Sequence, residues 1–235
     1  MGLLHDQVLG EISGKVGEII YRNRPGKKNV AYKIPEFTNI NYSPASVDNR
    51  NRFKPMTQFA SMVWSLPELK SIWDKHTRFK AKAAYHKIEQ ANARLFAPLH
   101  PTVNNIIVPS GFSLELNSAV ANKDKVSVSV SLNKLLYHDI NQIKSFNVIM
   151  MLCFFNPTNN EYLYYNFNRI RIYLSNWEYD KPVEITYNYL EDEGILFSMY
   201  HKCILYFTLI AQNAEKSYLA NSANKSIGFD IPHPG

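Results

Sequence analysis

Apolar residues recur along this chain with two different periods, and the change of period divides the sequence into three parts. Strand-like segments occupy residues 1–40, a period of three to four residues runs through 43–98, and alternation returns in 101–235. We therefore expect an α+β protein with an N-terminal β-hairpin arm, a short helical segment and a C-terminal antiparallel β-sandwich of the immunoglobulin-like kind.

The first part predicts a hairpin whose apolar side chains face both ways. Segments 17–24 and 28–34 flank a Pro-Gly turn, in which Pro presets φ and Gly supplies a positive φ. Along the first segment Ile20 lies on one face, and Ile19 with Tyr21 lies on the other. An isolated two-stranded hairpin is marginal in water, so these side chains need cover from the rest of the chain or from another copy.

The second part predicts helices. Ser43-Pro44 resembles a helix start, and Pro55 either kinks this helix or marks its true beginning. The apolar positions that recur at helical spacing are Phe53, Met56, Phe59, Val63 and Leu66. A basic stripe follows, which we interpret as a solvated helix face, with phosphate contact as the alternative; it consists of Lys80, Lys82, Lys87 and Arg94.

The third part predicts about seven strands. Residues 126–132 alternate without error, which is typical of a sheet with one buried face. Segments 146–155 and 162–174 flank a link rich in Asn and Pro, so we expect them to form a hairpin. Further strand-like segments are 183–189, 195–212 and 226–231.

Composition is that of a globular protein, with 46% hydrophobic and 20% charged residues. Residues 1–10 lack the features of a signal peptide, and no apolar stretch is long enough for a membrane span, so we expect synthesis in the cytoplasm. Cys153 and Cys203 lie in apolar runs and are predicted to be buried free thiols. The alternative is an inter-sheet disulfide near Trp177.

Charge is uneven along the chain. Residues 1–100 carry 16 Lys and Arg against 8 Asp and Glu, whereas residues 101–235 carry 10 against 12. This asymmetry predicts that the front part meets an acidic partner, either nucleic acid or a neighbouring subunit. For nucleic acid, the basic ribbon with its two tyrosines, Tyr21 and Tyr32, offers the candidate contacts Arg22, Arg24, Lys27, Lys28 and Lys33.

Motifs for catalysis are missing. Gly14-Lys15 resembles a phosphate-binding loop, but only three residues separate Gly10 from Gly14, and Val16 stands where a hydroxyl should hold magnesium. The histidines form no metal pair at helical spacing, and no nucleophile elbow is present. We therefore predict a protein that is not an enzyme, with no catalytic residue, no cofactor and no metal site. A carbohydrate or peptide site near Trp177 and Tyr179 is a further alternative.

Two segments carry a resemblance to known sequences. GEISGKVGEIIYRNRPGKKNVAYKIP, followed by SPASVDNRNRFKPMTQFASMVWSLPELKSIWDK, resembles a widespread group of uncharacterised bacterial and phage-associated proteins. The matching positions are Ser13, Gly14, Lys15, Gly17, Arg22, Gly26, Lys27, Pro35, Arg52, Phe53, Trp64 and Trp73. The rest of the chain has a general likeness to an immunoglobulin-like β domain. The resemblance implies a shared module, and a component of a particle or filament, rather than a reaction.

These observations lead to one hypothesis about function. We expect a structural, self-associating protein whose N-terminal arm links copies into a homo-oligomeric particle or filament, because an exchanged strand forms a contact that propagates. The predicted interface residues are Gly14, Lys15, Gly17, Ile19, Ile20, Tyr21, Arg22, Arg24 and Tyr32. The expected partners are other copies and further components of a phage-like particle, and the final location is a virion or assembled particle. Nucleic-acid binding by the ribbon is the alternative.

Overall fold

The structure is a computed structural model, and it describes the backbone of residues 2–3 and residues 14–22, 30–34, 42–132, 141–178, 181–190 and 192–233. The chain divides into two compact units, unit 1 (Met1–Ser43) and unit 2 (Pro44–Gly235). Helices and antiparallel strands are both present, so the predicted α+β class is confirmed.

Unit 1 is a four-stranded antiparallel sheet with strand order β1-β4-β3-β2. Its strands are β1 (Gly2–Leu3), β2 (Gly14–Val16), β3 (Ile19–Arg22) and β4 (Val30–Lys33). The predicted hairpin is confirmed, because β3 pairs with β4 and Ile20 lies opposite Tyr32. The Pro-Gly turn at 24–27 lies outside the described residues. The sequence pattern did not indicate β1 and β2.

The turn between β2 and β3 explains why glycine follows Val16. The φ of Gly17 is +60°, which is the left-handed conformation that the first central residue of a two-residue hairpin turn requires. Gly17 therefore places β2 beside β3, with Val16 opposite Ile19.

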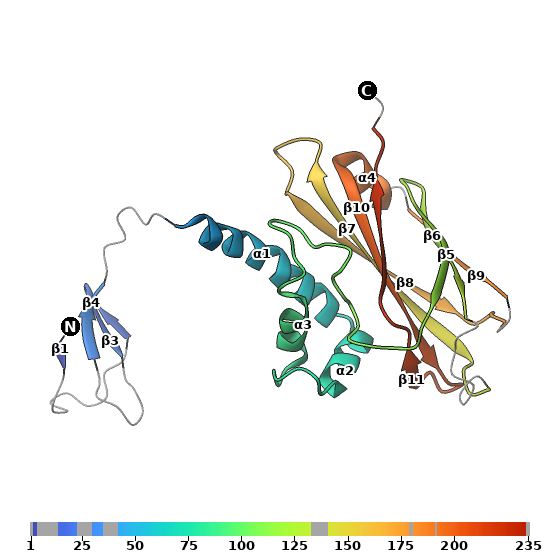
Figure 1. The fold of residues 1–235 in the computed structure, drawn as a ribbon, viewed down its shortest axis with the longest axis horizontal. Coiled ribbons are helices and arrows are strands. Elements are labelled where there is room, and N and C mark those ends of the chain that lie inside the picture. Colours follow the sequence, from blue (N-terminus) through green and yellow to red (C-terminus); the bar gives the residue numbers. More distant parts are fainter. Residues whose placement is uncertain are drawn as a thin grey trace. The chain divides into compact units, whose positions relative to one another are not determined.

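Unit 2 begins with the predicted helices, and the helical pattern of the second part is confirmed. They are α1 (Pro44–Trp64), α2 (Pro67–Lys75) and α3 (Ala84–Asn92). α1 continues through Pro55, whose ring is buried. Phe59 and Val63 are fully buried, but Phe53 is 60% exposed. The beginning of α1 extends beyond the sheet that the helix covers (Figure 1).

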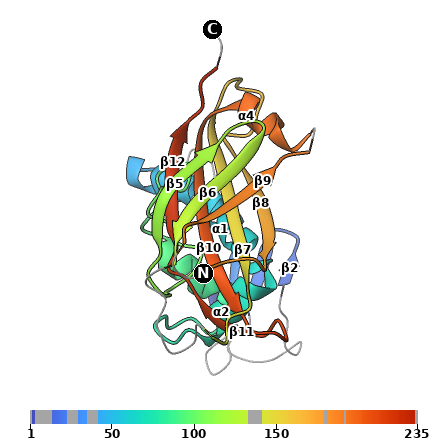
Figure 2. The same ribbon diagram turned by 90° about the vertical axis from the view of Figure 1, so that its right-hand side faces the viewer.

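The strands of unit 2 form two further sheets. The larger sheet contains β7 (Ser145–Pro157), β8 (Tyr165–Leu174), β10 (Tyr200–Gln212), β11 (Tyr218–Asn221) and β12 (Lys225–Asp230). The smaller sheet contains β5 (Glu115–Ala121), β6 (Lys125–Ser131) and β9 (Val183–Asn188). The larger sheet has the order β11-β10-β7-β8, with β12 also on β10, and the smaller has the order β5-β6-β9. Figure 2 shows the smaller sheet in front of the larger one.

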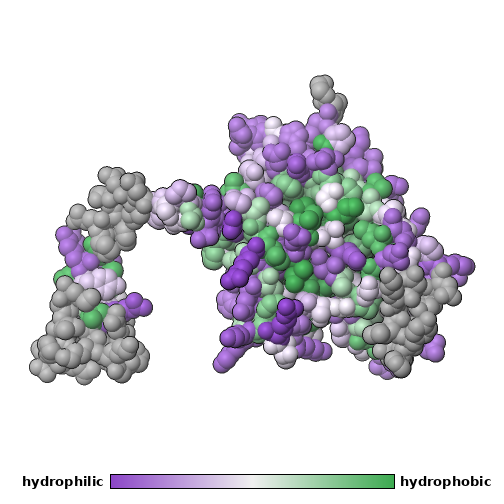
Figure 3. Space-filling view, in the orientation of Figure 1, coloured by the Kyte–Doolittle hydropathy of each residue, from purple (hydrophilic) through white to green (hydrophobic). Residues whose placement is uncertain are grey.

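The paired strands β7 and β10 are the middle layer of unit 2. On one face, Phe146 and Phe207 pack in a core with Val128 of the smaller sheet. On the other face, Met151 and Tyr206 pack with the helices. Because both faces are covered, these strands are nearly continuous apolar runs rather than alternating ones. Figure 3 shows one face of unit 2, on which hydrophobic residues gather in the middle and hydrophilic residues lie around them.

The strand predictions hold with three differences. The alternation in β6 and the pairing of β7 with β8 are confirmed. Residues 195–199, which the pattern assigned to a strand, belong instead to a short helical stretch made of η1 (Glu193–Ile195) and α4 (Leu196–Met199). The pattern did not indicate β5 and β11. Among the described residues, no helix is both long and apolar enough to cross a membrane.

Lys87 does not lie on a solvated face, so that interpretation is wrong for this residue. Its side chain is only 6% exposed. The ammonium Nζ donates hydrogen bonds to the carbonyls of Trp73, Asp74 and His76, at 3.1, 2.8 and 2.8 Å. Lys87 of α3 therefore caps the carboxyl end of α2, where backbone carbonyls lack helical partners.

The two cysteines are buried free thiols, as predicted. They lie on adjacent strands but point to opposite faces of the larger sheet, since Cys153 packs with the helices and Cys203 packs toward the smaller sheet. This arrangement excludes the alternative inter-sheet disulfide. Trp177 is half-buried and packs its ring on Phe146, with ring centroids 5.0 Å apart.

Burial of the thiols predicts a pH dependence of stability. Desolvation raises the pKa of both Cys153 and Cys203. Above the ordinary thiol pKa of about 8.5, the unfolded chain releases these protons and the folded chain retains them, so stability falls as pH rises. We expect the free energy of unfolding to decrease by about 1.4 kcal/mol per thiol for each pH unit.

Urea unfolding measures this effect when the wild type is compared with a Cys153→Ala/Cys203→Ala variant. The range is from about pH 8 up to about pH 10, where tyrosines begin to lose their protons. The double variant should lose most of the pH dependence in this range. An equal slope in both proteins would contradict it.

Candidate subunit interface

Unit 1 exposes apolar side chains on its sheet. Val16 and Ile19 lie opposite each other on β2 and β3 and are 62% and 42% exposed. Ile20 and Tyr32 are paired on the opposite face and are half-buried. Among the described residues of this unit, Val30 is the only buried one. The prediction of apolar residues on both faces is therefore confirmed.

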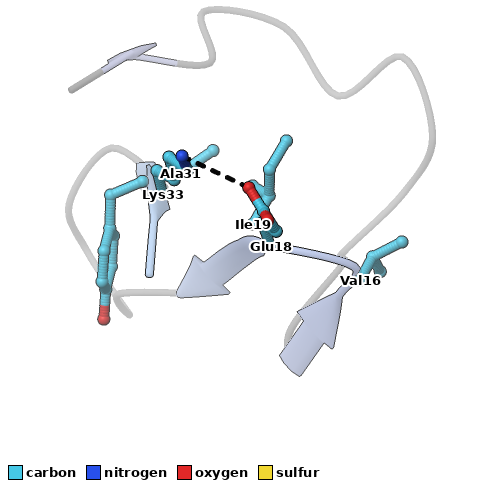
Figure 4. Close-up of a pocket in the computed structure, with 6 residues that line it drawn as sticks. Val16, Glu18, Ile19, Ala31 and Lys33 are labelled. Atoms are coloured by element: carbon cyan, nitrogen blue, oxygen red, sulfur yellow. Dashed lines mark ion pairs between the residues drawn. The ribbon is translucent and has the colours of Figure 1, made fainter. Parts of the chain in front are cut away.

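An open hollow of about 490 Å³ lies on this sheet. Its lining consists of Val16, Glu18, Ile19, Ala31, Tyr32 and Lys33. Figure 4 shows the Glu18 carboxylate reaching toward Lys33, and the two form an ion pair at 3.3 Å. The hollow is thus apolar with one ion pair at its side, which suits an apolar side chain of a partner.

The other predicted interface residues are not part of this lining, and one of them lies outside the described residues. Gly14 and Lys15 belong to the edge strand β2, whose three residues are all exposed. Tyr21 is half-buried and Arg22 is exposed on β3. The remaining predicted contacts, to a subunit or to nucleic acid, lie outside the described residues: Arg24, Lys27 and Lys28.

The edges of the sheets differ in how open they are to a further strand. β8 is an end strand of the larger sheet, but the side-chain oxygens of Asn166 and Asn168 accept the backbone N–H groups of Phe167 and Arg169, at 2.8 and 2.7 Å. Arg169 also donates to the Ser65 hydroxyl of the neighbouring helix layer. Occupied backbone donors protect an edge against strand addition. The short, exposed β2 carries no such side-chain contact among the interactions of the described residues.

A second concave region, which we call the α1–β8 groove, lies in unit 2. It joins two hollows of about 240 and 250 Å³, which share Gln58, Leu163 and Tyr165. The other lining residues are Arg50, Asn51, Lys54, Pro55, Ser61, Met62, Leu99, Tyr164, Asn166 and Phe167. No motif in the sequence indicates this groove, because its walls come from distant parts of the chain.

Tyr165 is the buried polar group of the α1–β8 groove. It is 7% exposed, and its hydroxyl has no hydrogen-bond partner in the described part of the chain. Burial raises the pKa of Tyr165 to about 12, so the hydroxyl remains protonated at neutral pH. An unpaired buried hydroxyl costs about 1–3 kcal/mol, which a hydrogen bond to a bound group would offset.

Comparisons with known proteins give little beyond this geometry. No family model and no curated protein matches the sequence. Part of the chain is similar to a solved beta-glucosidase from Kluyveromyces marxianus in complex with glucose, with 10% identity and a TM-score of 0.24, over 62% of this chain and 17% of that chain. The selenomethionine-labelled form of that enzyme gives 11% identity and a TM-score of 0.19 over the same shares. The chain therefore spans about 17% of the length of these structures, and a likeness this low does not establish a shared fold.

Proposed function

We propose that this protein is structural and self-associating, and that unit 1 links copies into a homo-oligomeric particle or filament. The observation that carries the proposal is the exposure of Val16 and Ile19 on unit 1, where Val30 is the only buried residue among those described. Residues 1–43 also contain no cysteine, so a disulfide cannot stabilise the unit. Domains this small usually need disulfides, metals or oligomerisation to be stable.

The exposed edge strand supplies the means of contact. A neighbouring copy can add a strand to β2 and place an apolar side chain in the hollow beside Val16 and Ile19. If the donor segment and the acceptor edge are different surfaces, the contact is heterologous and repeats from copy to copy. Such repetition gives rings when the rotation closes and filaments when it does not.

Unit 2 serves as the body of the assembly in this proposal. We interpret its two facing sheets as a β-sandwich of the immunoglobulin-like kind, with the helices as an additional layer. The resemblance of residues 10–75 to phage-associated proteins supports a particle of the phage-like kind. On this proposal the protein is made in the cytoplasm and resides in the assembled particle.

Exchanging the two exposed apolar residues for acids tests the proposal in the full-length chain. We expect wild-type protein to elute as an oligomer, and a Val16→Asp/Ile19→Asp variant to elute as a monomer of 27.1 kDa in size-exclusion chromatography with light scattering. The reason is that Lys33, the cation of the hollow, already pairs with Glu18, so two more carboxylates there would be desolvated without a partner charge of their own.

The matched control is Leu190→Asp/Ile195→Asp in unit 2, which replaces two side chains that are 74% and 57% exposed. This control should remain oligomeric. A monomeric wild type at micromolar concentration, or equal dissociation of both double variants, would contradict the proposal.

A further inference from the structure

The α1–β8 groove has a charge pattern that selects its occupant. Arg50 and Lys54 both line it, and because they are four residues apart on α1, their side chains lie on the same side of the helix. No described Asp or Glu lines either hollow. Glu161, on the loop before β8, is held by the Asn159 amide at 3.5 Å and lies outside both linings. The groove therefore favours an anion.

An aromatic stack at the groove selects further for a planar ring. His100 stacks on Phe155 with ring centroids 4.2 Å apart and planes 14° apart. Tyr164 continues this series at 6.4 Å from His100 and 21° from parallel. Tyr164 lines the groove and is 41% exposed, so its ring is accessible to one more planar group.

Amides and apolar side chains complete the lining. Asn51 and Gln58 offer both donors and acceptors for the edge of a heterocyclic base. Leu163, which is 66% exposed, adds an apolar wall shared by both hollows. Proteins that bind unpaired nucleotides combine two features, cations for the phosphates and an aromatic ring on which a base stacks.

We propose that the α1–β8 groove binds single-stranded nucleic acid, with phosphates on Arg50 and Lys54 and a base stacked on Tyr164. Each hollow has room for about one nucleotide, and the shared residues allow the strand to pass from one hollow to the next. An acidic peptide would satisfy the two cations but would leave the ring stack unused. The described residues that line this groove all belong to unit 2, and the proposal does not depend on the role of unit 1 in assembly.

Fluorescence anisotropy with a labelled oligodeoxythymidylate of about 12 nucleotides tests the proposal on the full-length chain. We expect Arg50→Ala/Lys54→Ala to weaken binding at least tenfold and to reduce the slope of log affinity against log salt by about 1.4, since each lost phosphate contact on a single strand contributes about 0.7. Tyr164→Leu should weaken binding about tenfold and leave the salt slope unchanged, because stacking releases no counterions.

Two control variants remove the same charge elsewhere. Lys123→Ala/Lys125→Ala acts at the exposed β5–β6 turn, and Lys15→Ala/Arg22→Ala acts on the ribbon of unit 1. Both should bind within about twofold of wild type. A tenfold loss in the ribbon variant would place the contact on unit 1 and overturn the proposal.

Competition separates the remaining occupants. An unlabelled oligonucleotide should displace the probe, whereas thymidine monophosphate and polyglutamate should not do so at equal concentration of charge. If polyglutamate competes equally well, the groove is an acidic-peptide site. If the mononucleotide competes equally well, the groove is a nucleotide pocket. Either outcome, or the absence of binding by wild type, overturns the proposal.

Discussion

Replacing Lys87 by Met is expected to lower the free energy of unfolding by about 3 kcal/mol. Met keeps an unbranched side chain one atom shorter than that of Lys, but it removes the ammonium that three carbonyls at the end of α2 share, with hydrogen bonds as short as 2.8 Å. Buried acceptors left without a donor carry their full desolvation cost, and the positive charge at the carboxyl end of the helix is lost as well. Chemical denaturation followed by tryptophan fluorescence measures the change, because Trp73 is adjacent to this cap.

Lys80→Met is the matched control, since Lys80 is exposed and lies just before α3, the helix that carries Lys87. It should change stability by less than about 0.5 kcal/mol. Equal unfolding midpoints for the two Met variants would show that Lys87 does not cap α2 in the way described.

Gly111→Ala is expected to destabilise unit 2 by about 3 kcal/mol or more, or to prevent folding. A Cβ at this position would lie 2.2 Å from the carbonyl carbon of Ser222 and 2.4 Å from the oxygen of Asn221. Both are backbone atoms, so they cannot move aside as a flexible side chain can. The next residue, Phe112, exchanges backbone hydrogen bonds with this segment, at 2.9 Å to Asn221 and 2.8 Å from Ala223.

Gly228→Ala is the control glycine, because its Cβ would meet only the Val103 side chain at 3.6 Å, an ordinary contact. Gly111→Ala should show a much lower melting temperature and a much lower soluble yield than Gly228→Ala. If Gly111→Ala melted at the same temperature as Gly228→Ala, the backbone at Gly111 and the backbone at Asn221–Ser222 would be able to separate without loss of stability.

The elements that the sequence reveals are those whose pattern is local. The alternation of 126–132 predicts β6 because one side of that strand faces the core and the other faces out. The apolar run of β7 predicts a strand, but it cannot indicate that helices cover one face and a sheet covers the other. Residues 195–199 are too few to establish a helical period, so their apolar character predicts a continuation of the strand that follows, β10.

The sites are less predictable because their partners are distant. The sequence around Lys87 does not distinguish it from a solvent-exposed lysine on a helix, because its partners at the end of α2 are brought to it only by helix packing. The α1–β8 groove depends on Leu163–Tyr165 meeting the side of α1 that carries Arg50, and no spacing in the sequence encodes that meeting. The apolar faces of the ribbon, by contrast, follow from strand alternation alone, so the sequence is sufficient to place Ile19 and Ile20 on opposite faces.

The position of β7 and β10 has a consequence for how unit 2 melts. Each strand contributes alternate side chains to both hydrophobic cores, so neither core can loosen while the other keeps its packing. The helices and the smaller sheet are thus thermodynamically coupled through one strand pair, and calorimetry of unit 2 should show a single cooperative transition. Any ligand that binds beside α1 would then protect the far sheet from hydrogen exchange as well, because both share that transition.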